Sequence, residues 1–165
     1  MKRILENISN LGMTLPECPQ PVAAYIPACR CGSLIFVSGQ LPSKEGKMPQ
    51  GRVPNEVSAE DAYTAAGQCF MNGLAAALSV LEANESLRLV QMQGFVQCVP
   101  EFKEIPQVIN GASELAMKVF GTEGAHARTA VGVAALPKNA PVEIAFTYQV
   151  EKEDSPKFEG RYNWL

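Results

Sequence analysis

The sequence predicts an α+β fold in which a mostly antiparallel sheet carries two helices packed on one face. The expected elements follow the order strand, strand, helix, strand, helix, strand, strand, and the last strand alternates apolar and polar side chains. A length of 165 residues with 47% hydrophobic and 19% charged residues is typical of one globular domain. We therefore expect a single domain over 1–165, with an N-terminal extension over 1–20 and a tail over 151–165.

The N-terminal third predicts a short helix, an extended stretch, two strands and a loop. Apolar residues recur at helical spacing until Gly12; they are Ile4, Leu5, Ile8 and Leu11. Prolines at positions 16, 19 and 21 favour an extended backbone. Strands are expected over 22–31 and 34–38, joined by a turn at Gly32-Ser33. The many glycines and prolines over 39–54 indicate irregular structure.

The middle of the chain predicts two helices separated by a strand. The first begins after Ser58, which with Asp61 forms an approximate capping box, and extends to about Ala83. Its apolar stripe consists of Phe70, Leu74, Ala77 and Leu81. A strand is expected over 87–99. The second helix is expected from near Pro106 to Gly121, because proline suits a first helical turn and glycine commonly follows the last.

The last two strands are expected over 128–135 and 142–150. If they paired as a hairpin centred on Lys138-Asn139, Arg128 would lie opposite position 149 and Glu143 opposite Ala134. Six residues would then separate Arg128 from Glu143 by roughly 20 Å within one chain. This geometry predicts that one small ligand contacts both side chains only where a second subunit supplies one of them or where the sheet is bulged.

The composition of the chain argues against several kinds of binding partner and against a metal site. A net charge of −3 and a pI near 5.3 argue against a nucleic-acid or membrane partner. Five cysteines without a CxxC pair or a secretory leader favour reduced thiols and a cytoplasmic location. His126 is the only histidine, so we expect no metal, and the motifs suggest no cofactor. No apolar run reaches the length that a membrane span needs.

Four segments within residues 21–150 resemble the RidA (YjgF, reactive-intermediate deaminase) family. They are Pro21-Val22-Ala23-Ala24-Tyr25-Ile26-Pro27-Ala28, Phe36-Val37-Ser38-Gly39-Gln40-Leu41-Pro42, Ala127-Arg128-Thr129-Ala130-Val131, and Leu136-Pro137-Lys138 with Val142-Glu143-Ile144. They stand in the family's order and spacing. Three further segments are similar to a bacterial branch of the family: Leu11-Gly12-Met13-Thr14-Leu15-Pro16, Asn110-Gly111-Ala112-Ser113-Glu114-Leu115 and Gly124-Ala125-His126-Ala127-Arg128-Thr129-Ala130-Val131-Gly132.

The resemblance implies a chorismate-mutase-like fold and a homotrimer with ligand clefts between subunits. It also implies hydrolysis of reactive 2-imino or 2-aminoenoic acids, which pyridoxal-phosphate enzymes release, to 2-oxo acids and ammonia. Members of the family have also been labelled endoribonucleases and translation inhibitors. The partner expected for this chain is therefore a small carboxylate-bearing molecule, such as a 2-imino or 2-oxo acid.

Arg128 is the leading candidate for binding that carboxylate. Its planar guanidinium matches a carboxylate with two parallel hydrogen bonds. The next residues on the same strand face are Ala130, Gly132 and Ala134, all small, which predicts a concavity beside the arginine. The alternative is an arginine that pairs with a structural carboxylate or lies exposed on a sheet edge.

Glu143 matches the family's acidic residue on the last strand. Val142 and Ile144 point to the opposite face, so Glu143 leaves the apolar side of the sheet. A carboxylate at this position activates water for attack on an imine carbon and passes a proton to the departing nitrogen. A solvent-facing glutamate on an alternating strand is the competing interpretation.

The resemblance supplies further ligand-binding candidates, each with a structural alternative. They are Tyr25, Ser38, Gly39, Asn110, Thr129, Ala130 and His126. Tyr25 equally suits a plain strand aromatic, Asn110 a local backbone partner near a helix start, and His126 an exposed or structural loop histidine.

Thr129 and Ala130 depart from the family pattern, in which serine and then cysteine follow the arginine. If the family's cysteine contributes mainly backbone groups and shape, alanine is tolerated; if its thiol acts, this chain binds a ligand without the usual hydrolysis or uses a different substrate. Three functions remain open: an imine or enamine hydrolase, a carboxylate-binding protein without turnover, and a ribonuclease or translation inhibitor. The last is the least favoured, because one histidine and an acidic total supply neither paired acid-base groups nor a basic track for phosphate.

Overall fold

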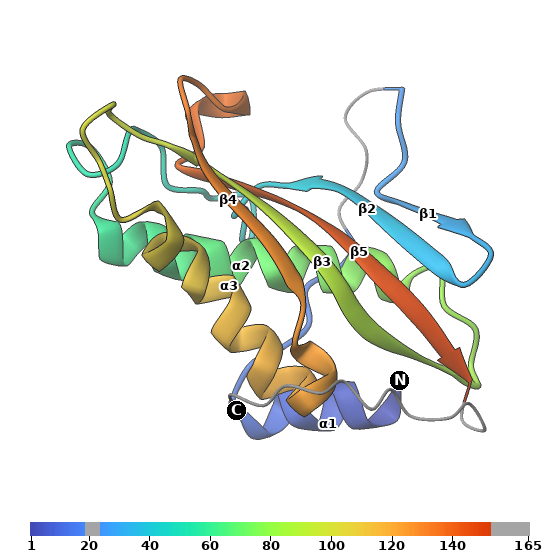
Figure 1. Ribbon diagram of the computed structural model, residues 1–165. Helices are drawn as coiled ribbons and strands as arrows, with labels where there is room; N and C mark the ends of the chain where they lie inside the picture. Colours follow the sequence, from blue (N-terminus) through green and yellow to red (C-terminus); the bar gives the residue numbers. More distant parts are fainter. Residues whose placement is uncertain (19–23, 153–165) are drawn as a thin grey trace.

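A five-stranded sheet, covered on one face by helices, forms the body of the computed structural model, which describes residues 1–18 and 24–152 (Figure 1). The strands are β1 (Ala28–Cys31), β2 (Leu34–Gln40), β3 (Glu85–Gln97), β4 (Ala127–Val133) and β5 (Val142–Lys152). The helices are α1 (Lys2–Asn10), α2 (Ala59–Leu78) and α3 (Ile105–Phe120), with short 3₁₀ turns η1 (Gly121–Gly124) and η2 (Pro137–Asn139). The predicted α+β class is confirmed. The expected strand start at 22–23 and the tail from 153 onward lie outside the described residues.

Local signals place the helix starts correctly. The Ser58 hydroxyl accepts a hydrogen bond from the Asp61 backbone N–H at 3.0 Å, and Pro106 lies in the first turn of α3. Gly121, with φ +67°, ends α3 in a backbone conformation that favours glycine. The first long helix ends at Leu78 rather than near Ala83, because i to i−3 backbone bonds after the last turn close it early.

The sheet order is β1-β2-β5-β3-β4, so the predicted hairpin between the last two strands is wrong. The strand β3 lies between β4 and β5, pairing parallel with β4 and antiparallel with β5. The helix α3 connects β3 to β4 as a crossover, which returns β4 parallel to β3 at the sheet edge. The remaining neighbours are antiparallel, so the sheet is mostly antiparallel as expected.

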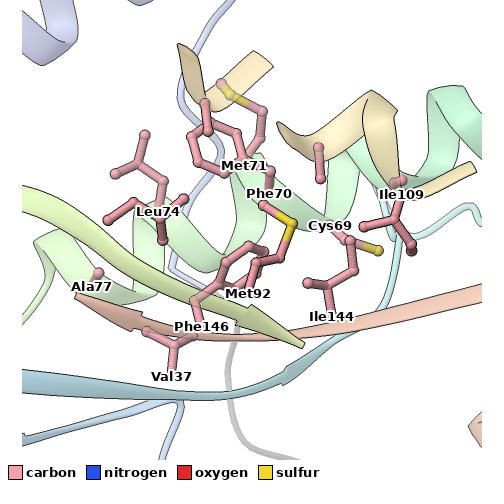
Figure 2. Close-up of a cluster of buried hydrophobic side chains, with 14 of the residues drawn as sticks. Val37, Cys69, Phe70, Met71, Leu74, Ala77, Met92, Ile109, Ile144 and Phe146 are labelled. Atoms are coloured by element: carbon pink, nitrogen blue, oxygen red, sulfur yellow. The ribbon is translucent and has the colours of Figure 1, made fainter. Parts of the chain in front are cut away.

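The core lies between the sheet and α2 and α3. Figure 2 shows side chains of α2, among them Phe70 and Leu74, against Ile144 and Phe146 of β5. The Phe70 and Phe146 rings meet edge to face with centroids 6.1 Å apart. Buried and half-buried residues alternate along β5, which confirms the period-two pattern.

The opposite face of the sheet is open. Within the described residues no helix covers it (Figure 1), and its residues on β5 are only half-buried. Phe36 of β2 and Val131 of β4 are 48% and 40% exposed. Large apolar side chains on an uncovered sheet face are typical of a contact surface.

Gly111 lets α2 and α3 pack closely, and replacing it tests the helix layer. A Cβ at Gly111 would overlap the Tyr63 carbonyl oxygen, so we expect Gly111→Ala to lower the free energy of unfolding by about 1–3 kcal/mol. Thermal unfolding measures this loss. Gly67→Ala is the matched control, because its Cβ would meet the nearest atom at an ordinary 3.5 Å; we expect no loss there. Equal destabilisation by both changes would contradict this packing.

Candidate functional site

Arg128 lies on the edge strand β4 and faces α3. Its lateral partner on β3 is the buried Met92, which places both side chains on the helix-covered face. The Arg128 Nη1 donates to Asn110 Oδ1 at 2.7 Å and to Ser113 Oγ at 3.1 Å. Among the described residues, Nε and Nη2 have no hydrogen-bond partner, and the side chain is exposed. Two acceptors on one helix therefore hold one side of the guanidinium while the other side is accessible.

His126 is linked to Arg128 through Ser113, which contacts both residues. Its Nε2 is 3.1 Å from Ser113 Oγ, and its Nδ1 is 2.6 Å from the Gly124 carbonyl oxygen. Since a carbonyl oxygen only accepts, Nδ1 carries the proton and neutral Nε2 accepts from the Ser113 hydroxyl. Burial lowers the pKa of His126, the Gly124 hydrogen bond opposes this, and the Arg128 charge lowers it further. The neutral imidazole is thus favoured. We call Asn110, Ser113, His126 and Arg128 the arginine cluster.

Ser113 is the member of the arginine cluster that sequence reasoning did not single out. It lies one helical turn after Asn110, a spacing that places both side chains on one face of α3. That spacing was the available signal, but it does not show that the pair faces Arg128, which depends on the pairing of β4 with β3.

The structural alternatives for Arg128 are partly excluded. Among the described residues, no carboxylate pairs with it; the ion pairs found there include Lys2 with Glu6, Arg3 with Glu123 and Arg30 with Glu85. Arg128 does lie exposed on a sheet edge, as one alternative states, but Asn110 and Ser113 hold its side chain by hydrogen bonds. The predicted concavity does not extend to Gly132, where a Cβ would meet Cys98 Sγ at 2.8 Å and Ile105 Cδ1 at 3.0 Å. Ala130 remains the small residue beside Arg128.

Glu143 lies at a second location, in a cavity of about 890 Å³. The cavity is also lined by Tyr25, Gly39 and the segment 12–18; we call it the glutamate cavity. A Cβ at Gly39 would overlap the Glu143 carboxylate, so this glycine makes room for it. Among the described residues the carboxylate has no hydrogen-bond or ion-pair partner, and burial raises its pKa. A half-buried carboxylate of this kind is suited to accept a proton.

The other predicted ligand residues do not all join these two locations. Tyr25 lies in a bend before β1 rather than in a strand, and is 46% exposed at the rim of the glutamate cavity. The Ser38 hydroxyl donates to the Ile26 carbonyl at 2.8 Å, so a local bond occupies its proton. Thr129 is exposed on the open face, opposite to Arg128.

Within one chain the arginine cluster and Glu143 lie on opposite faces of the sheet. Arg128 shares a lateral row with Met92 and Phe146, whereas Glu143 and Val131 both pair with Phe95. Two strand spacings and three residues separate the Cα atoms of Arg128 and Glu143 by roughly 14 Å, which replaces the 20 Å expected from a hairpin. The sheet itself stands between the two side chains.

The described part of the chain adds two further findings. It contains no group of three or more histidine, cysteine, aspartate or glutamate side chains arranged to hold a metal ion. No helix within residues 1–18 and 24–152 is both long and apolar enough to span a bilayer.

One family model and two known proteins match most of this chain. The sequence model of the endoribonuclease L-PSP family matches residues 16–150. A Trypanosoma cruzi protein, TCP17, is 36% identical over 86% of this chain and 91% of its own length. A 2-iminobutanoate/2-iminopropanoate deaminase of Dermatophagoides farinae is 31% identical over 84% of this chain and 95% of its own.

The fold has a solved counterpart at higher sequence identity. The crystal structure of Atu1372, a protein of unknown function from Agrobacterium tumefaciens, superposes with a TM-score of 0.81 at 42% identity. The match covers 91% of this chain and 94% of that one. The similarity thus includes all but about a tenth of this chain.

Proposed function

Because the chain belongs to the endoribonuclease L-PSP family, also called the RidA/YjgF family, we propose that it hydrolyses reactive 2-imino acids to 2-oxo acids and ammonia. The observation that carries the proposal is the guanidinium of Arg128. It is exposed, unpaired with acid among the described residues, and anchored through Nη1 alone. Nε and Nη2 together form the fork that binds a carboxylate with two hydrogen bonds.

The proposed site is completed by a second subunit. Arg128 and Glu143 of one chain lie on opposite faces of the sheet, so no small acid contacts both. The open sheet face, with Phe36 and Val131 exposed, supports contact with further copies of the chain. In the homotrimer that we propose, Arg128 of one subunit meets the glutamate cavity of its neighbour.

The chemistry assigns one task to each half of the site. Arg128 binds the carboxylate and places the adjacent C=N carbon in front of the neighbour's Glu143. Glu143 removes a proton from water while the water oxygen bonds to that carbon. Glu143 then gives this proton to the nitrogen of the former C=N bond. The C–N bond of the carbinolamine then breaks: the hydroxyl proton passes to the departing nitrogen, which leaves as ammonia, and the hydroxyl oxygen becomes the carbonyl of the 2-oxo acid. Water and imine are consumed and no oxidant or metal is needed.

A coupled assay tests the proposal. An amino-acid oxidase generates 2-imino acids in the reaction mixture, and the release of 2-oxo acid is followed with and without the protein. We expect the protein to accelerate release above the spontaneous rate for several imino acids. No acceleration with any of them would reject hydrolysis.

The pH dependence of this reaction tests the role of Glu143. The ionised carboxylate is the base, so kcat/KM falls as the pH drops through its pKa. Because burial raises that pKa above 4.5, we expect the acid limb at higher pH than an exposed glutamate would give. The spontaneous rate is subtracted at each pH. The limb should stay in place in His126→Gln; a limb that vanishes in that variant would assign it to His126 instead.

A second candidate is a carboxylate-binding protein without turnover. The observation in its favour is Ala130, which stands where deaminase members resembling this chain have cysteine. Binding of a 2-oxo acid without acceleration in the coupled assay is the result that would establish it.

A further inference from the structure

Arg128 is the first member of a chain of hydrogen bonds that continues through Ser113 and His126 to the Gly124 carbonyl oxygen. Arginine on an exposed edge strand carries about 2 kcal/mol of side-chain entropy, which binding must overcome unless the side chain is already held. Asn110 offers one fixed acceptor at 2.7 Å. The second acceptor, Ser113 Oγ, is a hydroxyl whose proton can point in several directions.

His126 offers the Ser113 hydroxyl the stronger of two nearby acceptors. Ser113 Oγ lies 3.1 Å from His126 Nε2. When the hydroxyl proton points to Nε2, the lone pairs of Oγ remain available to Arg128 Nη1. The competing acceptor is Met92 Sδ, a weaker one at 3.7 Å. The imidazole is itself held, because Nδ1–H donates to Gly124 O at 2.6 Å. A Cβ at Gly124 would lie 2.6 Å from Ala116 O, so the turn η1 packs tightly on α3, the helix that carries Ser113.

We propose that Ser113 and His126 are positioning residues that orient the Arg128 guanidinium for carboxylate binding, with the Nε2 side of His126 acting through Ser113. This inference rests on the proposed function only in that Arg128 binds a carboxylate; it does not require turnover. The Nδ1 side of the ring, in this proposal, serves only to hold the imidazole.

Two amide variants separate the two sides of the ring. The Oε1 of glutamine lies as many bonds from Cβ as Nε2 of histidine, so His126→Gln keeps an acceptor for Ser113. Asparagine reaches only the Nδ1 position, so His126→Asn keeps the donor to Gly124 and loses the acceptor. If His126 only stabilised the turn through Gly124, asparagine would be the better replacement.

The experiment is calorimetric titration of the full-length protein with 2-oxobutanoate, a stable 2-oxo acid, for the wild type, His126→Gln, His126→Asn and Ser113→Ala. We expect His126→Asn and Ser113→Ala to raise Kd about tenfold and His126→Gln to stay within about threefold. In the coupled assay the same two variants should raise KM while kcat stays nearly unchanged, since carboxylate binding is uniform between ground and transition states.

The outcomes are distinguishable. Wild-type affinity in Ser113→Ala, or weaker binding by His126→Gln than by His126→Asn, would overturn the proposal. So would the absence of Arg128-dependent binding of 2-oxobutanoate to the wild type. Binding that follows the predicted order without any imine hydrolysis would support the positioning role and reject only the hydrolase. Thermal unfolding of each variant identifies a change that acts through misfolding.

Discussion

Arg128→Ala is expected to lower kcat/KM for 2-imino acid hydrolysis by about two to three orders of magnitude, and to weaken 2-oxobutanoate binding to a similar degree. The substrate carboxylate loses its charged two-bond partner, and Asn110 and Ser113 lose the cation that they bind. The coupled assay and the calorimetric titration measure the two effects on one preparation.

Two variants sharpen this prediction. Arg128→Lys keeps the charge but not the planar fork, so we expect a loss of about tenfold, smaller than that of alanine. Arg30→Ala removes the same charge from β1 at the opposite edge of the sheet, where Arg30 pairs with Glu85 at 2.7 Å. It should reduce stability and leave KM unchanged. An equal loss of activity in Arg30→Ala would mean that the net charge, not the carboxylate fork, determines binding.

The elements of the fold were predictable because their signals are local. Ser58 caps α2 through the Asp61 N–H, Pro106 begins α3, and Gly121 ends it with a positive φ. The alternation along 142–150 correctly predicts β5 and its buried face. Each of these features depends on residues within a few positions of one another.

The order of the strands was not predictable in the same way. Alternation shows which side chains of a strand are buried but not which strand lies beside it. Strands that are consecutive in sequence, such as β4 and β5, often pair with each other, which favoured the hairpin. The structure inserts β3 between them, because α3 returns the chain to the free edge of β3. The register, and with it the distance between Arg128 and Glu143, followed from this non-local pairing.

The candidate site shows the same division. Arg128, Asn110 and Glu143 follow from motifs, and Asn110 does contact Arg128. The link from Ser113 to His126 depends on how α3 packs against the start of β4, which no local pattern encodes. Thr129 neighbours Arg128 in sequence but points to the opposite face, as the alternation of a strand requires.

Complementation between two inactive chains is expected to restore activity if neighbouring subunits build the site. Arg128→Ala retains the glutamate cavity, and Glu143→Gln retains the arginine cluster but loses the base, which we expect to cost about two to four orders of magnitude in kcat. In mixed assemblies some interfaces join an intact arginine cluster to an intact glutamate cavity. With equal amounts and random assortment, roughly one quarter of the interfaces do so.

The measurement that tests the central claim most directly is therefore the imine hydrolase activity of co-expressed Arg128→Ala and Glu143→Gln chains that carry different affinity tags. Two successive affinity steps isolate assemblies containing both chains, and each parent protein is assayed alongside. We predict that each parent protein is nearly inactive. We also predict that the co-expressed mixture, assayed before the affinity steps, has roughly a quarter of the wild-type rate. Mixed assemblies that form but remain as inactive as either parent would contradict a site shared between subunits.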